Sequence, residues 1–496
     1  MNLKKLYIAL GLISIFSLTN CKKVIDVEPE FTKDGDKIFK NLDEYEFALT
    51  GAYALFRQTG YFGSGAQTTS SWANLPDMLT DNMVQTTEDL ANWQTQVNWG
   101  YNAADPDIAV AWIAAYGVIS EANLVLRNIE QFASTNQKRV NRLKGQALAI
   151  RGMTHFDILR YWGVDYDRNS TALGVPYITK VDISLKPARL TVKETWDNIF
   201  KDMLEAETLL SDVDKTINTS TNKGNLDLLA VRGLLSRMYL YAKDYAKAEQ
   251  YASLVISSVP LASKTNFPLI WTDASQSEVL FSVVFSSGEG SPSAGVHIGS
   301  SNRNRFRPAT PLTNTYDQVN DVRFNSYYAS RPSGTPSASN PRTIVPFSAN
   351  ARKIVNKFMA RSTTYDNLVN WKVIRTGELY LIRAEARAMQ GGAKEALGLQ
   401  DLNDLRAARI TGYTPVVLTG QALKDEIMLE RRKELFGEGH HWFDLRRTTK
   451  TINRTDIGNG STKATLAPSA REWVWPIPQG ELDANPNMAG QQNPGY

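Results

Sequence analysis

The chain has 496 residues, of which 42% are hydrophobic and 21% charged, an ordinary composition for a folded globular protein. Its formal net charge is +4, and two of the positive charges, Lys4 and Lys5, lie at the extreme N-terminus. So small a balance excludes a strong electrostatic footprint for nucleic acid, and we expect no nucleic-acid partner. The 11 Trp and 20 Tyr are enough to fill a core and to leave rings for stacking recognition of a ligand.

The first residues predict an export signal. MNLKK is a short basic segment, LYIALGLISIFSL is an apolar run too short for a comfortable membrane span, and Cys21, the only cysteine, follows closely. We interpret residues 1–20 as a bacterial lipoprotein signal peptide, Cys21 as the acylated first residue of the mature protein, and 21–38 as a polar linker. An ordinary secretory signal is the alternative, because Asn20 is larger than the small residue usual before a lipidated cysteine. Two or three acyl chains would anchor the protein firmly, and no later segment is expected to approach a membrane span.

Apolar residues at helical spacing predict long helices over 42–58, 107–133, 138–162 and 190–211. The last of these begins with Thr191 and has Glu194 three residues later, the pattern of a capping box. Two further segments, 228–257 and 377–409, each predict two helices joined by a short turn and are similar to tetratricopeptide units. A generic helical hairpin is the alternative, and the two segments are too far apart for a simple solenoid.

Two regions lose the helical period and are loop-like, 59–104 and 259–370. The second is dense in Gly, Ser, Pro and Asn, and within it EVLFSVVF (278–285) predicts a strand. Long loops inside a compact protein usually carry function. We therefore divide the chain into an N-terminal helical region, 39–258, with a binding loop at 59–104, an irregular ligand-facing region, 259–370, and a C-terminal helical region, 371–496.

Residues 430–447 have the sequence ERRKELFGEGHHWFDLRR, in which His, Glu and Arg lie close together. Such a cluster is a candidate catalytic or metal centre. His440 and His441 are adjacent, however, and would point about 100° apart on a helix, while His155 and His297 fit no ligand spacing. We therefore predict no transition-metal site. The sequence contains no nucleophile elbow, phosphate-binding loop or dinucleotide fingerprint.

No cofactor is expected. Loop oxygens around Asp34–Asp36 or Asp105–Asp107 leave a structural calcium ion open, although neither stretch matches an EF-hand loop. Paired carboxylates leave no local signature, so a surface glycoside hydrolase stays as an alternative function.

We favour a structural role for residues 430–447 over a catalytic or metal-binding one. Apolar residues at 423, 427, 435 and 436 predict a helix from Leu423 that ends at Gly437 or Gly439. Glu430 with Lys433, and Arg431 with Glu434, are spaced for ion pairs on that helix. Trp442 and Phe443 would then anchor the end of the segment against the core.

ERRKELFGEGHHWFDLRR also resembles the C-terminal signature of the SusD/RagB family, E-R-R-x-E-L-x-x-E-G-x-R/H-W-x-D-L-R-R. Its matching positions are Glu430, Arg431, Arg432, Glu434, Gly439, His441, Trp442, Asp444, Arg446 and Arg447. Segments 112–129, 143–179 and 475–496 are similar to further family patterns, although Trp162 stands where one of them has Tyr and a proline arrives later. The resemblance covers nearly the whole chain.

The resemblance implies a mainly α fold, in which four tetratricopeptide-like helix pairs support an irregular, loop-rich, ligand-facing lobe. It implies a non-catalytic lipoprotein on the outer face of the outer membrane. Such a protein binds an oligosaccharide or another nutrient and acts as the lid of a SusC-like TonB-dependent transporter. A protein–protein adaptor without a small-molecule ligand is a further alternative, and the ligand itself is not named by the sequence.

Sugar faces pack on aromatic rings, and sugar hydroxyls need directional polar partners. We therefore predict ligand contacts among the aromatic and polar residues of the two loop regions: Trp72, Asp77, Asp81, Asn82, Trp93, Trp99, Tyr101, Phe306, Tyr316, Arg323, Tyr327 and Tyr328. Trp112, Tyr116, Trp162 and Trp442 lie in helical or signature segments and are assigned to the core.

Overall fold

The computed structural model describes residues 39–64, 70–90, 92–298, 303–331, 347–348, 352–361, 366–458 and 463–496. The predicted signal peptide, Cys21 and the linker to residue 38 lie outside the described residues, as do parts of both loop regions.

The α-helices are α2 (Leu42–Leu55), α3 (Leu75–Met78), α4 (Gln94–Val97), α5 (Pro106–Leu126), α6 (Ala133–Trp162), α7 (Val192–Leu210), α8 (Leu228–Tyr241), α9 (Tyr245–Ile256), α10 (Phe267–Ile270), α11 (Thr310–Thr313), α12 (Val322–Tyr327), α13 (Thr376–Gln390), α14 (Ala393–Arg409), α15 (Gly420–Glu434), α16 (His441–Arg447) and α17 (Gln479–Ala484). The strands are short: β1 (Met83–Gln85), β2 (Val279–Val283), β3 (His297–Ile298), β4 (Arg303–Asn304), β5 (Phe306–Pro308), β6 (Tyr328–Arg331), β7 (Arg352–Val355), β8 (Trp371–Arg375), β9 (Ile452–Asn453) and β10 (Thr465–Leu466). The predicted helix-rich fold is confirmed.

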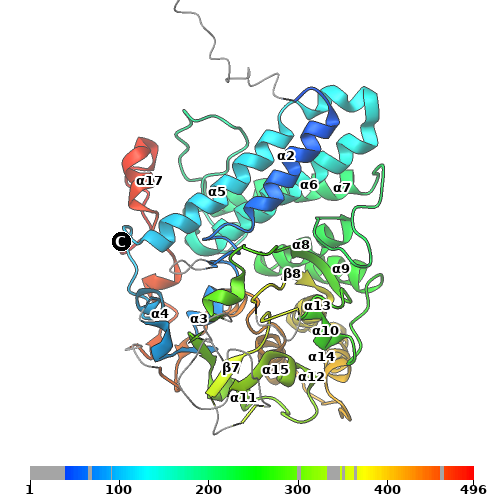
Figure 1. Ribbon diagram of the computed structural model, residues 1–496, viewed down its shortest axis with the longest axis vertical. Helices are drawn as coiled ribbons and strands as arrows, with labels where there is room; N and C mark the ends of the chain where they lie inside the picture. The colour runs from blue at the N-terminus through cyan, green and yellow to red at the C-terminus, as the bar shows by residue number, and fades with distance from the viewer. Residues whose placement is uncertain are drawn as a thin grey trace, which may run out of the picture.

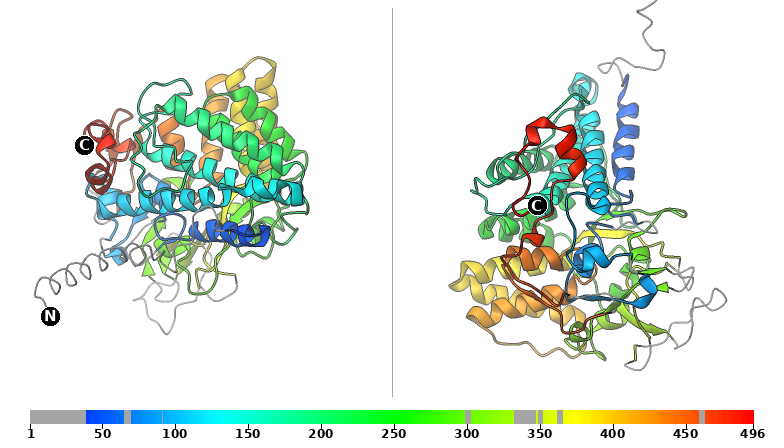
Figure 2. Two further views of the ribbon diagram at one scale, coloured as in Figure 1. Left: turned by 90° about the horizontal axis from the view of Figure 1, so that it is seen from above. Right: turned by 90° about the vertical axis from the view of Figure 1, so that its left-hand side faces the viewer.

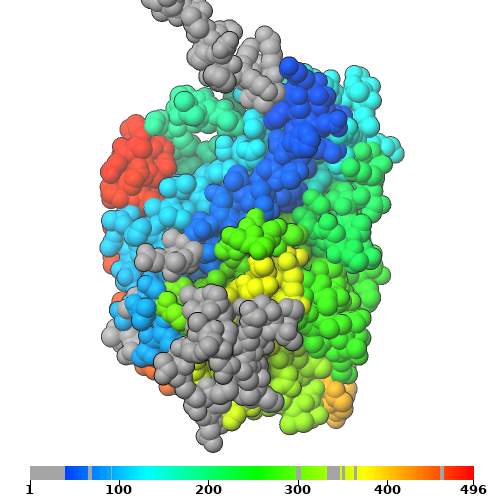
Figure 3. All heavy atoms as spheres, viewed as in Figure 1, coloured from blue at the N-terminus to red at the C-terminus, as the bar shows by residue number. Residues whose placement is uncertain are grey.

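Four long helices, α2, α5, α6 and α7, form the upper half of the molecule in Figure 1, with α5 packed between α2 and α6 and α7 packed on α6. In Figure 3, α2 is the dark-blue ridge across the upper part of this face. The predicted capping box is present, because Thr191 and Glu194 bond reciprocally at the start of α7. Glycines let α6 and α7 approach closely: a Cβ added at Gly152 would lie 2.9 Å from the side chain of Met203.

The helix boundaries differ from the predicted ones in one instructive place. The helix predicted over 107–133 ends at Leu126, and the chain then passes through a short 3-10 turn, Ile129–Phe132, into α6. The predicted break before residue 138 is a kink, since Asn136 has φ −160° inside α6.

By length and hydropathy, one described stretch, Pro106–Trp162, is apolar enough to cross a membrane, and 56% of its most apolar window is buried inside the protein. It consists of α5 and α6, which lie in the packed layer of long helices. We expected no segment after the signal to be long and apolar enough for a membrane span, and that expectation is wrong for this stretch. Helix α5 is rich in alanine and valine because it packs between two other helices.

The lower half contains two helical hairpins, α8–α9 and α13–α14, which pack against each other through α9 and α13, while α15 packs on α13. Both predicted helix–turn–helix segments are thus helical hairpins. In the right-hand view of Figure 2, the yellow and orange helices α13–α15 occupy one side of this half and the short green strands the other.

Antiparallel pairs of strands connect segments that are distant in the sequence. The predicted strand in 278–285 is β2, and it pairs with β8 at the end of the irregular region. Strand β1 pairs with β5, with Met83 opposite Pro308. This pair joins the two loop regions, 59–104 and 259–370, into one side of the molecule.

Candidate functional site

The signature stretch 430–447 forms the end of α15, a turn and α16. Helix α15 begins at Gly420 and ends at Glu434, three residues before the predicted glycine stop. Gly437 and Gly439 lie in the turn with φ of +69° and +80°, a backbone conformation that favours glycine. At Gly439 an added Cβ would come within 2.3 Å of the Trp72 carbonyl oxygen, so the turn also needs glycine for space.

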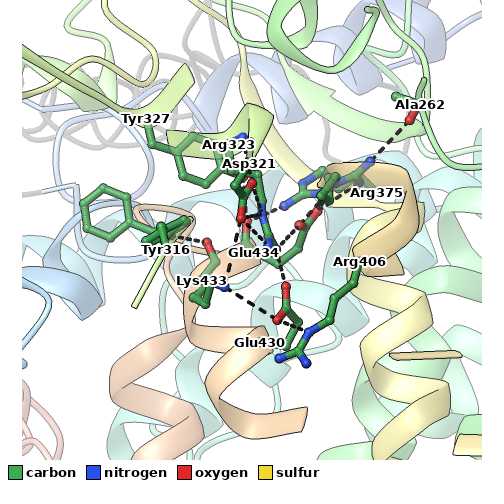
Figure 4. A network of polar contacts seen from close by, with 12 residues as sticks. Ala262, Tyr316, Asp321, Arg323, Tyr327, Arg375, Arg406, Glu430, Lys433 and Glu434 are labelled. Carbon is green, nitrogen blue, oxygen red and sulfur yellow. Dashed lines mark hydrogen bonds and ion pairs between the residues drawn. The ribbon is translucent and has the colours of Figure 1, made fainter. Parts of the chain in front are cut away.

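Glu434 is the centre of a buried ion-pair network (Figure 4). Its carboxylate lies 2.9 Å from Arg323 Nη1, 2.6 Å from Arg375 Nη1 and 2.9 Å from Arg409 Nη2. All four side chains are at most 1% exposed. Burial alone would raise the pKa of Glu434, but the three guanidinium groups hold it well below its usual value.

The predicted pairs within the signature are partly present. Lys433 Nζ lies 3.8 Å from Glu430, as the spacing indicates. The expected contact of Arg431 with Glu434 is not among the ion pairs of the described residues, because Arg431 reaches Asp444 of α16, 2.8 Å away. The segment therefore ties α15, α16 and distant elements together.

The remaining signature residues also make structural contacts. Arg447 pairs with Asp444 at 2.8 Å and also with Glu385 of α13. Arg446 donates to the carbonyl oxygens of Arg160 and Gly163. Trp442 is fully buried and packs on Trp473 with 4.4 Å between ring centroids.

Three polar residues predicted to bind ligand hold the signature in place. Arg432 lies 2.9 Å from Asp81 and donates to Asn82 Oδ1 at 2.6 Å, and His441 Nε2 lies 3.0 Å from Asp81 Oδ1. Asn82 in turn donates to Asp77 at 2.7 Å. Burial would raise the pKa of Asp81, but the hydrogen bond with His441 and the charge of Arg432 lower it.

The other predicted contacts need correction, because these side chains belong to the core. Trp72, Trp93, Trp99, Tyr101, Phe306, Arg323, Tyr327 and Tyr328 are at most 2% exposed and Tyr316 is 6% exposed. Their polar atoms have protein partners in several cases: Trp72 Nε1 donates to the Asp157 carbonyl at 3.0 Å and Tyr327 Oη to the Glu434 carbonyl at 2.8 Å. A ring covered on both faces offers no platform for a ligand. The loops fold inward over α15, which composition alone does not indicate.

Trp112, Tyr116 and Trp162 pack together with the core as expected, with 5.1 Å between the ring centroids of Trp112 and Trp162.

No group of three or more His, Cys, Asp or Glu side chains within the described residues is placed to hold a metal ion. Asp105 accepts from the backbone N–H groups of Asp107 and Ile108 and caps α5. Gln96 Nε2 donates to Asp107 at 2.7 Å. Burial and the charge of Asp105 raise the pKa of Asp107 to about 7. Asp34–Asp36 lie outside the described residues.

The surface has hollows that the sequence did not predict. A pocket of about 420 Å³ lies between α10, α12 and the turn after β7; its lining is Pro268, Trp271, Thr272, Val322, Asn325, Ser326, Asn356, Met359 and Ala360. A polar cleft of about 640 Å³ runs along 258–263 and 273–279, and a hollow of about 450 Å³ lies between the α8–α9 turn, α13 and α15. Trp271, in the irregular region, is the aromatic residue from which the sequence could have indicated the pocket between α10 and α12.

Two family profiles match separate parts of the chain. The profile of the SusD family matches residues 299–496, and a second profile, described as starch-binding associating with the outer membrane, matches residues 58–240. A SusD-like protein of Formosa agariphila, P38, is 24% identical over an alignment of 543 residues that covers 98% of this chain and 97% of the relative. A second, P25, is 20% identical, with 87% of each chain covered.

Solved structures are similar over nearly the whole described chain. A SusD superfamily protein from Bacteroides thetaiotaomicron has 27% identity and a TM-score of 0.75, covering 92% of this chain and 100% of that one. A SusD superfamily protein from Bacteroides vulgatus has 25% identity, a TM-score of 0.76 and the same coverage. A putative sugar-binding protein from Bacteroides vulgatus has 26% identity and a TM-score of 0.73, covering 92% and 99%. Both profiles match, and the fold is shared over 92% of the chain. The chain therefore belongs to the SusD/RagB family.

Proposed function

We propose that the protein is a carbohydrate-binding surface lipoprotein that captures its ligand for a SusC-like TonB-dependent transporter and closes over that transporter as a lid. The observation that carries this proposal is the match of both halves of the chain to SusD-type families, one of them described as starch-binding and associated with the outer membrane. A solved relative of the same fold is described as a putative sugar-binding protein. The family is one of binding proteins and not of enzymes.

The chemistry of the signature argues against a hydrolytic role for its own carboxylates. Its buried carboxylates, Glu430, Glu434 and Asp444, are each paired with arginine. A glycosidase needs two carboxyl groups that face a sugar across a cleft. Carboxylates that are buried in the core and paired with arginine cannot face a sugar in this way.

The first test is binding of purified protein to oligosaccharide panels by calorimetry, in parallel with assays for oligosaccharide turnover. Binding without turnover is the expected result. Turnover that is lost in a single Asp or Glu variant would establish the glycosidase alternative, and peptide binding without sugar binding would change the ligand class.

A second test addresses the anchor. Replacement of the expected lipidation site, Cys21→Ala, should release the protein from the membrane fraction and remove radiolabelled palmitate. The matched control is Ser17→Ala, in the same apolar segment, which should leave both unchanged. Membrane retention of C21A at the wild-type level would refute the lipid anchor.

A third test addresses the partner. Affinity purification from detergent-solubilised outer membranes should recover a TonB-dependent transporter in stoichiometric amount. A stable complex with a transporter, combined with no affinity for any oligosaccharide or peptide, would establish the adaptor alternative.

A further inference from the structure

We propose that the pocket between α10 and α12 is a subsite for a neutral sugar residue of the bound carbohydrate, an inference that rests on the proposed function. Helices α10 and α12 lie next to each other in the lower half of Figure 1. The pocket, at about 420 Å³, falls within the range typical of small-molecule sites.

The walls of the pocket carry polar groups that are free to bind a ligand. Asn325, on α12, is exposed, and Asn356, after β7, is half-buried. Neither side-chain amide hydrogen-bonds to a residue that the structure describes. Each amide has two N–H donors and one carbonyl acceptor, the directional partners that sugar hydroxyl groups require. Since they come from different elements, they can engage two sides of one ring.

Two hydroxyl groups add acceptors. Ser326 Oγ donates to the Val322 carbonyl at 2.6 Å, and Thr272 Oγ1 donates to the Leu269 carbonyl at 3.2 Å. Because each hydroxyl proton is already used inside the protein, the oxygen lone pairs remain as acceptors. The pocket therefore offers both donors and acceptors, as a hydroxyl-rich ligand needs.

The base of the pocket is apolar and deeply buried. Trp271 and Met359 line it with only 3% and 1% of their surface exposed, so they leave too little surface for ring stacking. Trp271 is held by Phe267, Tyr327 and Phe358, whose ring centroids lie 5.2 to 5.6 Å away. Such a base suits the C–H groups of a sugar.

The family signature fixes this base from beneath. The ammonium group of Lys357 lies 4.0 Å from the centroid of the Trp271 ring. It donates to the Phe436 carbonyl and to Glu438, both at 2.7 Å. The turn between α15 and α16 thus positions the floor of the pocket through one buried lysine, although no signature residue lines the pocket itself.

The absence of charged side chains in the pocket favours an uncharged ligand. None of its nine lining side chains is charged. Asp273 and Arg361, the chain neighbours of the lining residues Thr272 and Ala360, pair with each other at 2.7 Å. An anionic group in this pocket would lose hydration without gaining a cationic partner. We therefore expect neutral sugars to bind here and uronic or sulfated sugars to be disfavoured.

The test measures calorimetric affinity of the full mature chain for neutral oligosaccharides (malto-, cello-, laminari-, xylo- and mannohexaose) and for acidic ones (polygalacturonate and sulfated galactan fragments). The variant is Asn325→Ala with Asn356→Ala, because both amides are accessible and neither supports the core. The matched control is Asn169→Ala, an exposed asparagine in another part of the molecule. Melting temperatures confirm that each variant folds.

We expect binding to at least one neutral oligosaccharide, a loss of at least tenfold in the double variant, and no change in the control. Equal binding by wild type and double variant would overturn the subsite while leaving the carbohydrate-binding function intact. Binding confined to acidic oligosaccharides would overturn the neutral class. No binding to any oligosaccharide would overturn the proposed function, and the subsite with it.

Discussion

Glu434 is the carboxylate that three buried guanidinium groups share. Replacement by glutamine keeps the shape but removes the negative charge, so each arginine loses one of its buried carboxylate partners. Asp321 still pairs with Arg323, and Glu278 still pairs with Arg375 and Arg409. We expect Glu434→Gln to lower the free energy of unfolding by about 3–5 kcal/mol, the usual cost of breaking a buried ion pair. Urea unfolding followed by circular dichroism measures it.

The control for this variant is Glu426→Gln, whose side chain is 33% exposed and pairs with Arg406 at the periphery of the network. Its loss should cost less than about 1 kcal/mol. Similar costs for the two variants would show that the network does not act through burial.

His441 is predicted to stabilise the fold and not to bind ligand. Its Nε2 lies 3.0 Å from Asp81, at the contact between the signature and the loop that follows α3, and it lines none of the hollows described above. His441→Ala should lower the free energy of unfolding by about 1–3 kcal/mol and leave oligosaccharide affinity unchanged. Lost affinity with an unchanged melting temperature would contradict this assignment.

Residue-level prediction from sequence succeeded where the partner lay one helical turn away, as for Glu430 and Lys433. It failed where the partner was distant: the arginines around Glu434 lie 25, 59 and 111 residues away along the chain. Helical spacing constrains only neighbours three or four residues apart. Arg431 was misassigned for the same reason, since Asp444 lies on the next helix.

At the scale of elements, the capping box of α7 is a local feature that can be tested alone. Thr191 accepts from the Glu194 backbone N–H at 3.1 Å, and Glu194 accepts in return from the Thr191 backbone N–H at 2.9 Å. Thr191→Ala should lower the free energy of unfolding by about 1 kcal/mol.

A suitable control on the same helix is Thr208→Ala, because the exposed Thr208 hydroxyl donates to the Leu204 carbonyl one turn earlier. This change should stay within about 0.5 kcal/mol of the wild type. Equal effects at the two threonines would show that the cap contributes nothing specific.

Helices with a clear apolar period were predictable, and so was strand β2. Its partner β8 was not, because about 90 residues of irregular chain separate the two strands and local pattern carries no information on such pairing. The aromatic loop residues were misjudged for a related reason. Trp72 and Trp99 are surrounded by polar and small residues in the sequence, but the chain folds them against Tyr161 and Leu79.

For the whole molecule, buried titratable groups couple stability to pH in opposing directions. Burial lowers the pKa of His155 to about 3 and holds the pKa of His297 and His440 well below the ordinary value. These histidines stay neutral in the folded protein, whereas in the unfolded chain they bind protons below about pH 6.5. They therefore favour unfolding as the pH falls from about 6.5.

Asp107 acts in the opposite direction, and its contribution can be isolated. Its folded pKa is about 7 because of burial and the charge of Asp105, while an unfolded aspartate titrates near pH 4. Between these values the folded carboxyl keeps a proton that the unfolded one has lost, so its contribution to stability declines as the pH rises from about 4 to 7.

Asp107→Asn removes this decline and keeps an oxygen that can accept from Gln96. The variant should match the wild type near pH 4 and become more stable than it by about 1–3 kcal/mol at pH 8. Urea unfolding at intervals from pH 4 to pH 8 measures the difference, with the exposed Asp483→Asn as the control. A difference that is constant with pH, or that shrinks as the pH rises, would mean that Asp107 ionises in the folded protein as it does in the unfolded chain. Growth of the difference would show that burial and the charge of Asp105 keep the Asp107 carboxyl protonated in the folded protein at pH values where an unfolded aspartate is ionised.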